Sequence, residues 1–157
     1  MHKNFDYRSS IILGMHDAIV SLTGLIAGLF FAFADKNIIV LSCIISSITA
    51  SLSMGAANYL AVKTVNKSHA LRAALFTGAS YMITCLFLIL PFLVFYNQNI
   101  AILCVFIITI LIIYLFNFIF YRKSQFTRHF CEMLGICFTV SLIAFIIGEF
   151  AKIFLGV

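Results

Sequence analysis

Three side chains in the first two apolar segments have the types and the depth that ion coordination requires. Asp17 lies inside the first segment, and an ionisable carboxylate within a bilayer is costly enough that its default role is functional. Met54 and Asn58 lie in the second segment, which runs in the opposite direction. At about 1.5 Å rise per residue, Asp17 and Met54 both lie roughly 10 Å from the same membrane face. The sequence therefore predicts that these two side chains meet.

A carboxylate beside a thioether combines a hard ligand with a soft one. Ca(II) and Mg(II) prefer oxygen alone, whereas Fe(II), Mn(II) and Co(II) suit a mixed site. Asn58 lies one helical turn beyond Met54, and Glu132 enters the last apolar segment from the same membrane side, so both are further candidate metal ligands. Two plainer interpretations stay open. Met54 can be core filling, and Glu132 can be a headgroup-level carboxylate paired with Arg128.

The first segment carries a stripe of small and polar residues. Asp17, Ser21, Gly24 and Gly28 recur at helical spacing and share one face. Small residues let helix backbones approach closely in lipid, and Gly-x-x-x-Gly is a common form of such a contact. The stripe could line one side of an ion pathway. Alternatively, it could be a packing seam in which Asp17 is hydrogen-bonded to a residue of a neighbouring helix. His16 faces elsewhere on the helix and is predicted to be a packed or interfacial histidine.

Long membrane helices must position these residues. The composition is 64% hydrophobic and 10% charged, whereas a soluble domain is about one-quarter charged. Each apolar run exceeds the ~20 residues that span about 30 Å of hydrocarbon, and the runs lack the alternation of an outer-membrane strand. The fold class is therefore predicted to be all-α, and short connections make residues 1–157 a single five-helix transmembrane domain. The predicted helices are at about 11–33, 38–62, 73–96, 100–121 and 130–155.

The distribution of cations predicts the orientation, because short cytoplasmic loops retain Lys and Arg. Most of the 10 cations fall on one side, and the opposite side holds only Lys36 and Lys152. The amino terminus is therefore predicted to be cytoplasmic and the carboxyl terminus outside. The net charge of +5 is explained by the cations that orient the protein in the membrane, so it does not indicate a nucleic-acid partner. The cations of the cytoplasmic side are Lys3, Arg8, Lys63, Lys67, Arg72, Arg122, Lys123 and Arg128.

Other chemistry-bearing residues argue against an enzyme. The five cysteines form no C-x-x-C pair, so neither a disulfide framework nor a zinc site is predicted. They are interpreted as small apolar fillers, with a soft-metal thiolate role as the alternative. Because the sequence has no Ser-His-Asp set and no H-E-x-x-H motif, no catalytic residue is predicted. No cofactor is predicted either, since the metal ion is a transported substrate.

Several stretches resemble the vacuolar iron transporter family. Residues 16–28, HDAIVSLTGLIAG, are similar to its first helix, where an Asp and a Val-Ser step open a Gly- and Ala-rich span. Residues 53–59, SMGAANY, are similar to its second-helix motif of Ser-Met, three small residues, Glu and Tyr. Stretches at 73–92 and 132–148 are similar to its third and fifth helices. The resemblance therefore covers nearly the whole chain.

The resemblance implies a homodimer whose first helices border a central pathway that carries ferrous or similar divalent ions out of the cytosol in exchange for protons. Asp17 and Met54 match the family's intramembrane metal positions. Asn58 stands where the family commonly has Glu, which removes a charge, and Glu132 could compensate for it. The link at 63–72 is too short for the cytoplasmic metal-binding domain of the iron-transporting members. The chain thus resembles a short form of the family.

The sequence as a whole predicts a divalent transition-metal transporter, with Fe(II) or Mn(II) as the expected ion, that exports metal in exchange for protons. Its expected partners are a second copy of itself, the lipid bilayer, metal ions and protons. We expect a multi-pass protein of a bacterial inner membrane, or of an organelle membrane in a eukaryote. The alternative is a transport-inactive membrane adaptor or assembly protein with the same fold.

Overall fold

The computed structural model describes residues 6–32, 35–120 and 123–155, and the fold over these residues is all-α. The chain forms α1 (Arg8–Ala32), α2 (Lys36–Val65), α3 (Ala70–Val94), α4 (Gln98–Phe120) and α5 (Lys123–Leu155). All five helices are long and apolar enough to cross a membrane. This confirms the predicted all-α fold with five membrane-spanning helices.

The helices differ from the apolar runs from which they were predicted: all five begin earlier, and α3 ends at Val94 rather than at Tyr96. α2 continues to Val65, and α5 begins at Lys123 rather than near Phe130. Lys, Arg and Gln are good helix formers, so a helix continues past its apolar run into residues whose side chains reach water. The predicted helix ends at Phe33 and Tyr121 lie outside the described residues.

Side-chain caps mark the beginnings of α2 and α4. The Asp35 carboxylate accepts a hydrogen bond from the Asn37 backbone N–H at 2.8 Å. The Asn97 side-chain oxygen accepts one from the Asn99 backbone N–H at 2.9 Å. Each bond satisfies a donor that the first turn of a helix leaves without an intrahelical partner. Local sequence therefore sets where these two helices begin.

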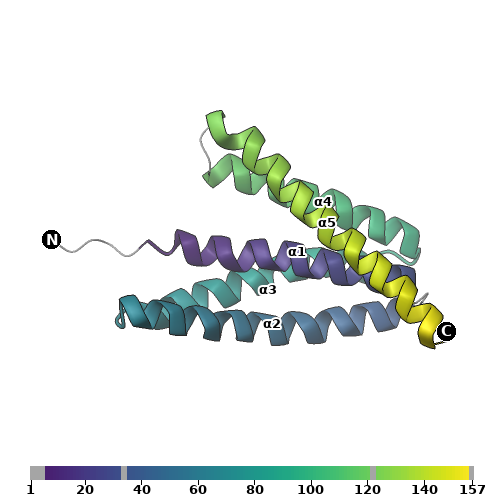
Figure 1. The fold of residues 1–157 in the computed structure, drawn as a ribbon, viewed down its shortest axis with the longest axis horizontal. Helices are drawn as coiled ribbons and strands as arrows, with labels where there is room; N and C mark the ends of the chain where they lie inside the picture. The colour runs from purple at the N-terminus through teal and green to yellow at the C-terminus, as the bar shows by residue number, and fades with distance from the viewer. Residues whose placement is uncertain (1–5, 33–34, 121–122, 156–157) are drawn as a thin grey trace.

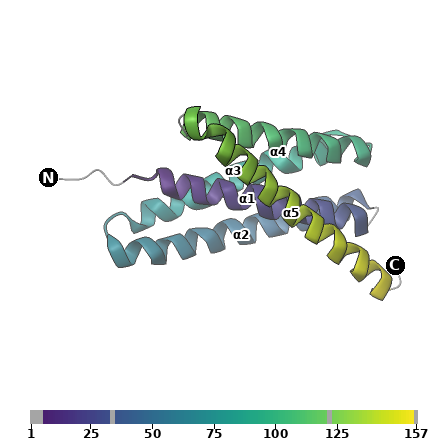
Figure 2. The same ribbon diagram turned by 45° about the horizontal axis from the view of Figure 1, so that its top comes forward.

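α1 runs through the centre of the molecule. It contacts α2 and α3 on one side and α4 and α5 on the other (Figure 1). α5 crosses α1 obliquely rather than lying parallel to it (Figure 2). The beginning of α1, the turn from α2 to α3 and the beginning of α5 lie at one end of the molecule, and the carboxyl terminus lies at the other end (Figure 1). The position of α1 therefore decides what surrounds Asp17.

Two apolar clusters hold α1 in place. The larger cluster joins α1, α2, α3 and α4, and the smaller one joins α1, α4 and α5. Because both clusters include residues of α1, this helix connects the two halves of the bundle. The larger cluster includes Leu22, Cys43, Tyr81, Leu88 and Phe92, and the smaller one includes Ile19, Ile113, Phe116 and Met133.

Polar side chains are buried between the helices, and apolar side chains cover the outside. Leu52, Phe118 and Phe150 each expose about two thirds of their surface. This distribution reverses that of a water-soluble protein and suits a bundle in lipid, where helices associate through close packing and interhelical hydrogen bonds. The buried polar residues are Ser10, Thr23, Ser47, Ser51, Asn58, Thr77, Thr84, Thr109 and Asn117.

The second half of the small-residue stripe of α1 packs against α5. A Cβ atom added at Gly28 would lie 3.1 Å from the Ala144 carbonyl oxygen, and one added at Gly148 would lie 2.7 Å from the Gly28 carbonyl oxygen. Gly24 faces the Val140 side chain in the same way. Of the two roles that the sequence left open for these glycines, the structure shows the packing seam.

Candidate metal-ion site

Asp17 lies in the first half of the stripe. Its side chain is half-buried, and Ser21, one turn further along, is exposed. Among the described residues, no hydrogen bond or ion pair holds the Asp17 carboxylate. The structure therefore does not show the alternative in which a neighbouring side chain bonds this carboxylate within a packing seam. A carboxylate at this depth without such a partner is available to a cation.

Tyr81 of α3 lies beside Asp17 and was missed as a site residue by sequence reasoning. Its hydroxyl is 2.8 Å from the Ser21 hydroxyl, and the Ser21 hydroxyl donates to the Asp17 backbone carbonyl at 2.6 Å. Because serine has only one hydroxyl proton, Tyr81 is the donor in the Tyr81–Ser21 bond. Tyr81 is within electrostatic reach of the Asp17 carboxylate. This contact depends on how α1 and α3 are rotated against each other, for which the sequence carries no signal.

Glu132 approaches the site from α5. His16 is half-buried and within electrostatic reach of both Asp17 and Glu132. The Glu132 side chain is 61% exposed and pairs with His129 Nδ1 at 3.6 Å. The structure therefore pairs Glu132 with His129 rather than with Arg128, the partner considered from the sequence. His16 therefore lies near acidic side chains of both α1 and α5.

Asn58 belongs to a buried polar network that joins α1, α2 and α3. Its Nδ2 donates to Thr77 Oγ1 at 2.6 Å, to Ser10 Oγ at 3.0 Å and to the Ala73 carbonyl oxygen at 3.3 Å. The single Thr77 hydroxyl proton is shared between the Ser10 and Ala73 carbonyl oxygens, each 3.0 Å from Oγ1. The network gives Asn58 a structural role that the sequence did not predict.

Met54 lies on the side of α2 that packs toward the other helices. It is half-buried and contacts the larger apolar cluster, to which Ala18 and Leu22 of α1 belong. Its thioether therefore faces the interior of the bundle rather than the lipid. This position agrees with a sulfur ligand beside α1 and equally with core filling.

The predicted ligands do not form a closed coordination shell. Among the residues that the structure describes, no three His, Cys, Asp or Glu side chains come close enough together to hold a metal ion. Asp17 supplies a carboxylate on α1, Met54 a thioether on α2, and Glu132 a second carboxylate on α5.

Comparison with known proteins adds one finding. The sequence model of the VIT family matches residues 8–70, which span α1, α2 and the first residue of α3. No curated protein matches the chain. The matched part contains Asp17, Met54 and Asn58, and Glu132 lies beyond it. The match to this family indicates metal-ion transport in general, and the five apolar helices indicate an integral, multi-pass membrane protein. The match confirms, over the first two helices, the resemblance to the vacuolar iron transporters that the sequence predicted.

Proposed function

We propose that this protein exports a divalent transition-metal ion, Fe(II) or Mn(II), from the cytosol in exchange for protons. The observation that carries the proposal is the Asp17 carboxylate, half-buried in a membrane-spanning helix without a hydrogen bond or ion pair among the described residues. A carboxylate held in this state is stabilised when a cation binds it. The family match supports metal ions as the cations.

Asp17 and Met54 hold the ion in this proposal. The carboxylate compensates charge, and the thioether favours a borderline metal over Ca(II) or Mg(II). A metal ion binds the deprotonated carboxylate, so a proton and the metal compete for Asp17. An acidic exterior would therefore release the metal there and load the carboxylate with a proton.

A second copy completes the pathway in this proposal. One Asp17 compensates only half the charge of a divalent ion, and a two-fold axis along α1 would bring a second Asp17 to it. The stripe leaves room for this contact, because α5 covers Gly24 and Gly28 but Ser21 and Leu13 of the same helix are exposed. We therefore propose a homodimer that meets along the first half of α1.

The other two predicted ligands receive separate roles. Glu132 is exposed and lies near His16. We propose that its carboxylate attracts the ion before Asp17 binds it. The amide nitrogen of Asn58 already donates to α1 and α3, so we propose that Asn58 positions these helices. This role differs from the direct ligation expected from the sequence.

Flux through proteoliposomes tests the proposal. Uptake of Fe(II), Mn(II) and Co(II) is measured with and without a pH gradient. Asp17→Asn should abolish uptake of every ion while the protein stays folded. Asp35→Asn is the matched control, because Asp35 lies outside the spanning helices and an Asn side chain can still accept the Asn37 N–H bond. Native-rate uptake by Asp17→Asn would refute the assignment.

The ion and the pH supply further tests of the same pathway. Met54→Leu should slow softer ions more than Mn(II), because only the thioether is removed. Lowering the pH on the loading side should slow uptake, since protons occupy the carboxylate that the metal needs. If the native protein transports none of these ions, the result would instead support the alternative function, a transport-inactive membrane adaptor or assembly protein.

A further inference from the structure

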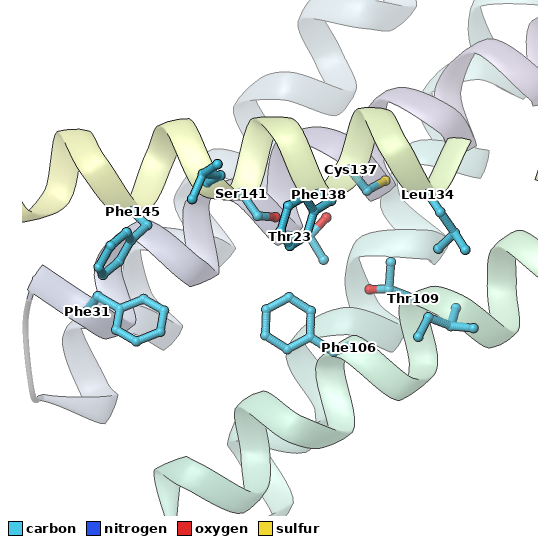
Figure 3. A pocket seen from close by; sticks show the side chains of 11 residues that line it. Thr23, Phe31, Phe106, Thr109, Leu134, Cys137, Phe138, Ser141 and Phe145 are labelled. Carbon is cyan, nitrogen blue, oxygen red and sulfur yellow. The ribbon is translucent and has the colours of Figure 1, made fainter. Parts of the chain in front are cut away.

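A cavity of about 520 Å³ opens between α1, α4 and α5 (Figure 3). α4 and α5 lie on the opposite side of α1 from α2 and α3 (Figure 1). Its volume lies within the roughly 300–1,000 Å³ of small-molecule sites. Its walls are almost entirely apolar, with aromatic rings from all three helices. The lining phenylalanines are Phe31, Phe106, Phe138 and Phe145. Neither Asp17 nor Met54 lines this cavity.

The Thr109 hydroxyl is the unusual feature of the cavity wall. Thr109 is only 4% exposed and lines the cavity with its side chain pointing inward (Figure 3). Its Oγ1 has no hydrogen-bond partner among the residues that the structure describes. The carbonyl oxygen four residues earlier is the usual acceptor for a threonine within a helix. Other threonines of the spanning helices use that acceptor: Thr23, Thr49, Thr77, Thr84 and Thr139.

An unpartnered buried hydroxyl limits what the cavity can hold. Leaving such a group unsatisfied is unfavourable in an apolar environment, and the hydrocarbon tails of lipids offer no acceptor. Thr109 lies roughly 16 Å from either end of α4, near the middle of the membrane. A ligand would therefore arrive from the bilayer and would be mostly apolar. It would also need one hydrogen-bond acceptor to satisfy the hydroxyl.

We propose that the cavity binds a membrane-soluble aromatic ketone or quinone-like compound, whose carbonyl oxygen accepts a hydrogen bond from Thr109 Oγ1. The phenylalanine rings pack against the rings of the ligand in offset or edge-to-face contacts. The site does not depend on the metal pathway. Evidence for or against ligand binding in the cavity therefore does not bear on the transport activity proposed above.

Photolabelling tests the site. Benzophenone, an aryl ketone that crosslinks on irradiation, is added to the native protein in lipid nanodiscs, and labelled peptides are mapped by mass spectrometry. We expect labels on α4 and α5 at the cavity wall. Fluorenone should compete better than fluorene, which has the same ring system without the carbonyl, by roughly threefold to tenfold, the range for one hydrogen bond.

Variants at Thr109 isolate the hydroxyl. Thr109→Val should remove the preference for fluorenone over fluorene, and Thr109→Ser should keep it. Thr139→Val is the control, because that exposed hydroxyl bonds within its own helix and should not matter. Equal competition by the two compounds in the native protein would overturn the proposal, since the cavity would then be only a crevice for lipid tails. Labelling that appears only after dimers dissociate would overturn it as well, because a second copy would then fill the space.

Discussion

The side-chain amide of Asn58 determines how this residue contributes to the packing of the helices. The amide of Asn58 has two protons to donate, and it directs them at acceptors on α1 and α3. An ionised carboxylate at the same place accepts hydrogen bonds but donates none, so it could not bond the Ala73 carbonyl oxygen, and it could bond Ser10 and Thr77 only if their hydroxyls became the donors. Asn58 therefore forms hydrogen bonds between helices without placing a charge in the interior of the bundle.

A double-mutant cycle between Asn58 and Thr77 measures this bond. Asn58→Ala and Thr77→Val should each destabilise the protein, and their coupling free energy should be about 0.6 kcal/mol, the average for such contacts within membranes. Unfolding in mixed detergent gives the free energies. Pairing Asn58→Ala with Thr49→Val, which alters a hydroxyl bonded within α2, should show additivity. A coupling near zero for the Asn58–Thr77 pair would remove the network as a source of stability.

At the scale of the helices, the seam between α1 and α5 decides which part of the α1 stripe stays accessible. Gly28 and Gly148 bring the two backbones close together, and small residues are what permits such an approach in lipid. α5 therefore covers the second half of the stripe. The first half, with Asp17 and Ser21, keeps the polar surface that the proposed metal pathway requires.

Substitution of Gly148 tests this seam. Gly148→Ala places a methyl group 2.7 Å from the Gly28 carbonyl oxygen, so the helices must separate, and the free energy of unfolding should fall by about 1–3 kcal/mol. Gly135→Ala is the control on the same helix, since an added Cβ there meets nothing within 4 Å. That substitution should stabilise α5 by roughly 0.5–1 kcal/mol. Equal effects of the two substitutions would argue against close packing at Gly148.

At the scale of the whole molecule, the cations divide between its two ends. Lys63, Lys67 and Arg72 flank the turn from α2 to α3, and this turn lies at the same end as the beginning of α1 (Figure 1). Lys3 and Arg122 lie outside the described residues. By the positive-inside rule, the end with the described cations is expected to face the cytosol.

Labelling of single cysteines tests the orientation. In a cysteine-free variant, Ser68→Cys lies in the turn from α2 to α3, and Asn99→Cys lies at the beginning of α4. Both positions are exposed. An impermeant maleimide added outside intact cells should label position 99 and leave position 68 unlabelled until the membrane is opened. Labelling of both from outside would contradict the proposed topology.

Crosslinking tests the dimer. Leu13 is 45% exposed on the α1 face that carries Asp17, so Leu13→Cys in the cysteine-free variant should form a covalent dimer with a short bis-maleimide in lipid. Leu41→Cys, at a 60% exposed position on α2, should give much less dimer. We would abandon the α1 interface if the two variants crosslinked equally.

The sequence by itself determined the five helices and Asp17 as the intramembrane carboxylate, because the length and hydropathy of a run are local properties of the chain. The tertiary structure alone decided that α5 covers Gly24 and Gly28, that Asn58 of α2 bonds to α1 and α3, and that Tyr81 meets Ser21. It also decided that Thr109 faces a cavity. These contacts depend on how helices far apart in the sequence are rotated and crossed against one another. In lipid, close packing and hydrogen bonds set that arrangement, and the apolar pattern of a single helix does not encode it.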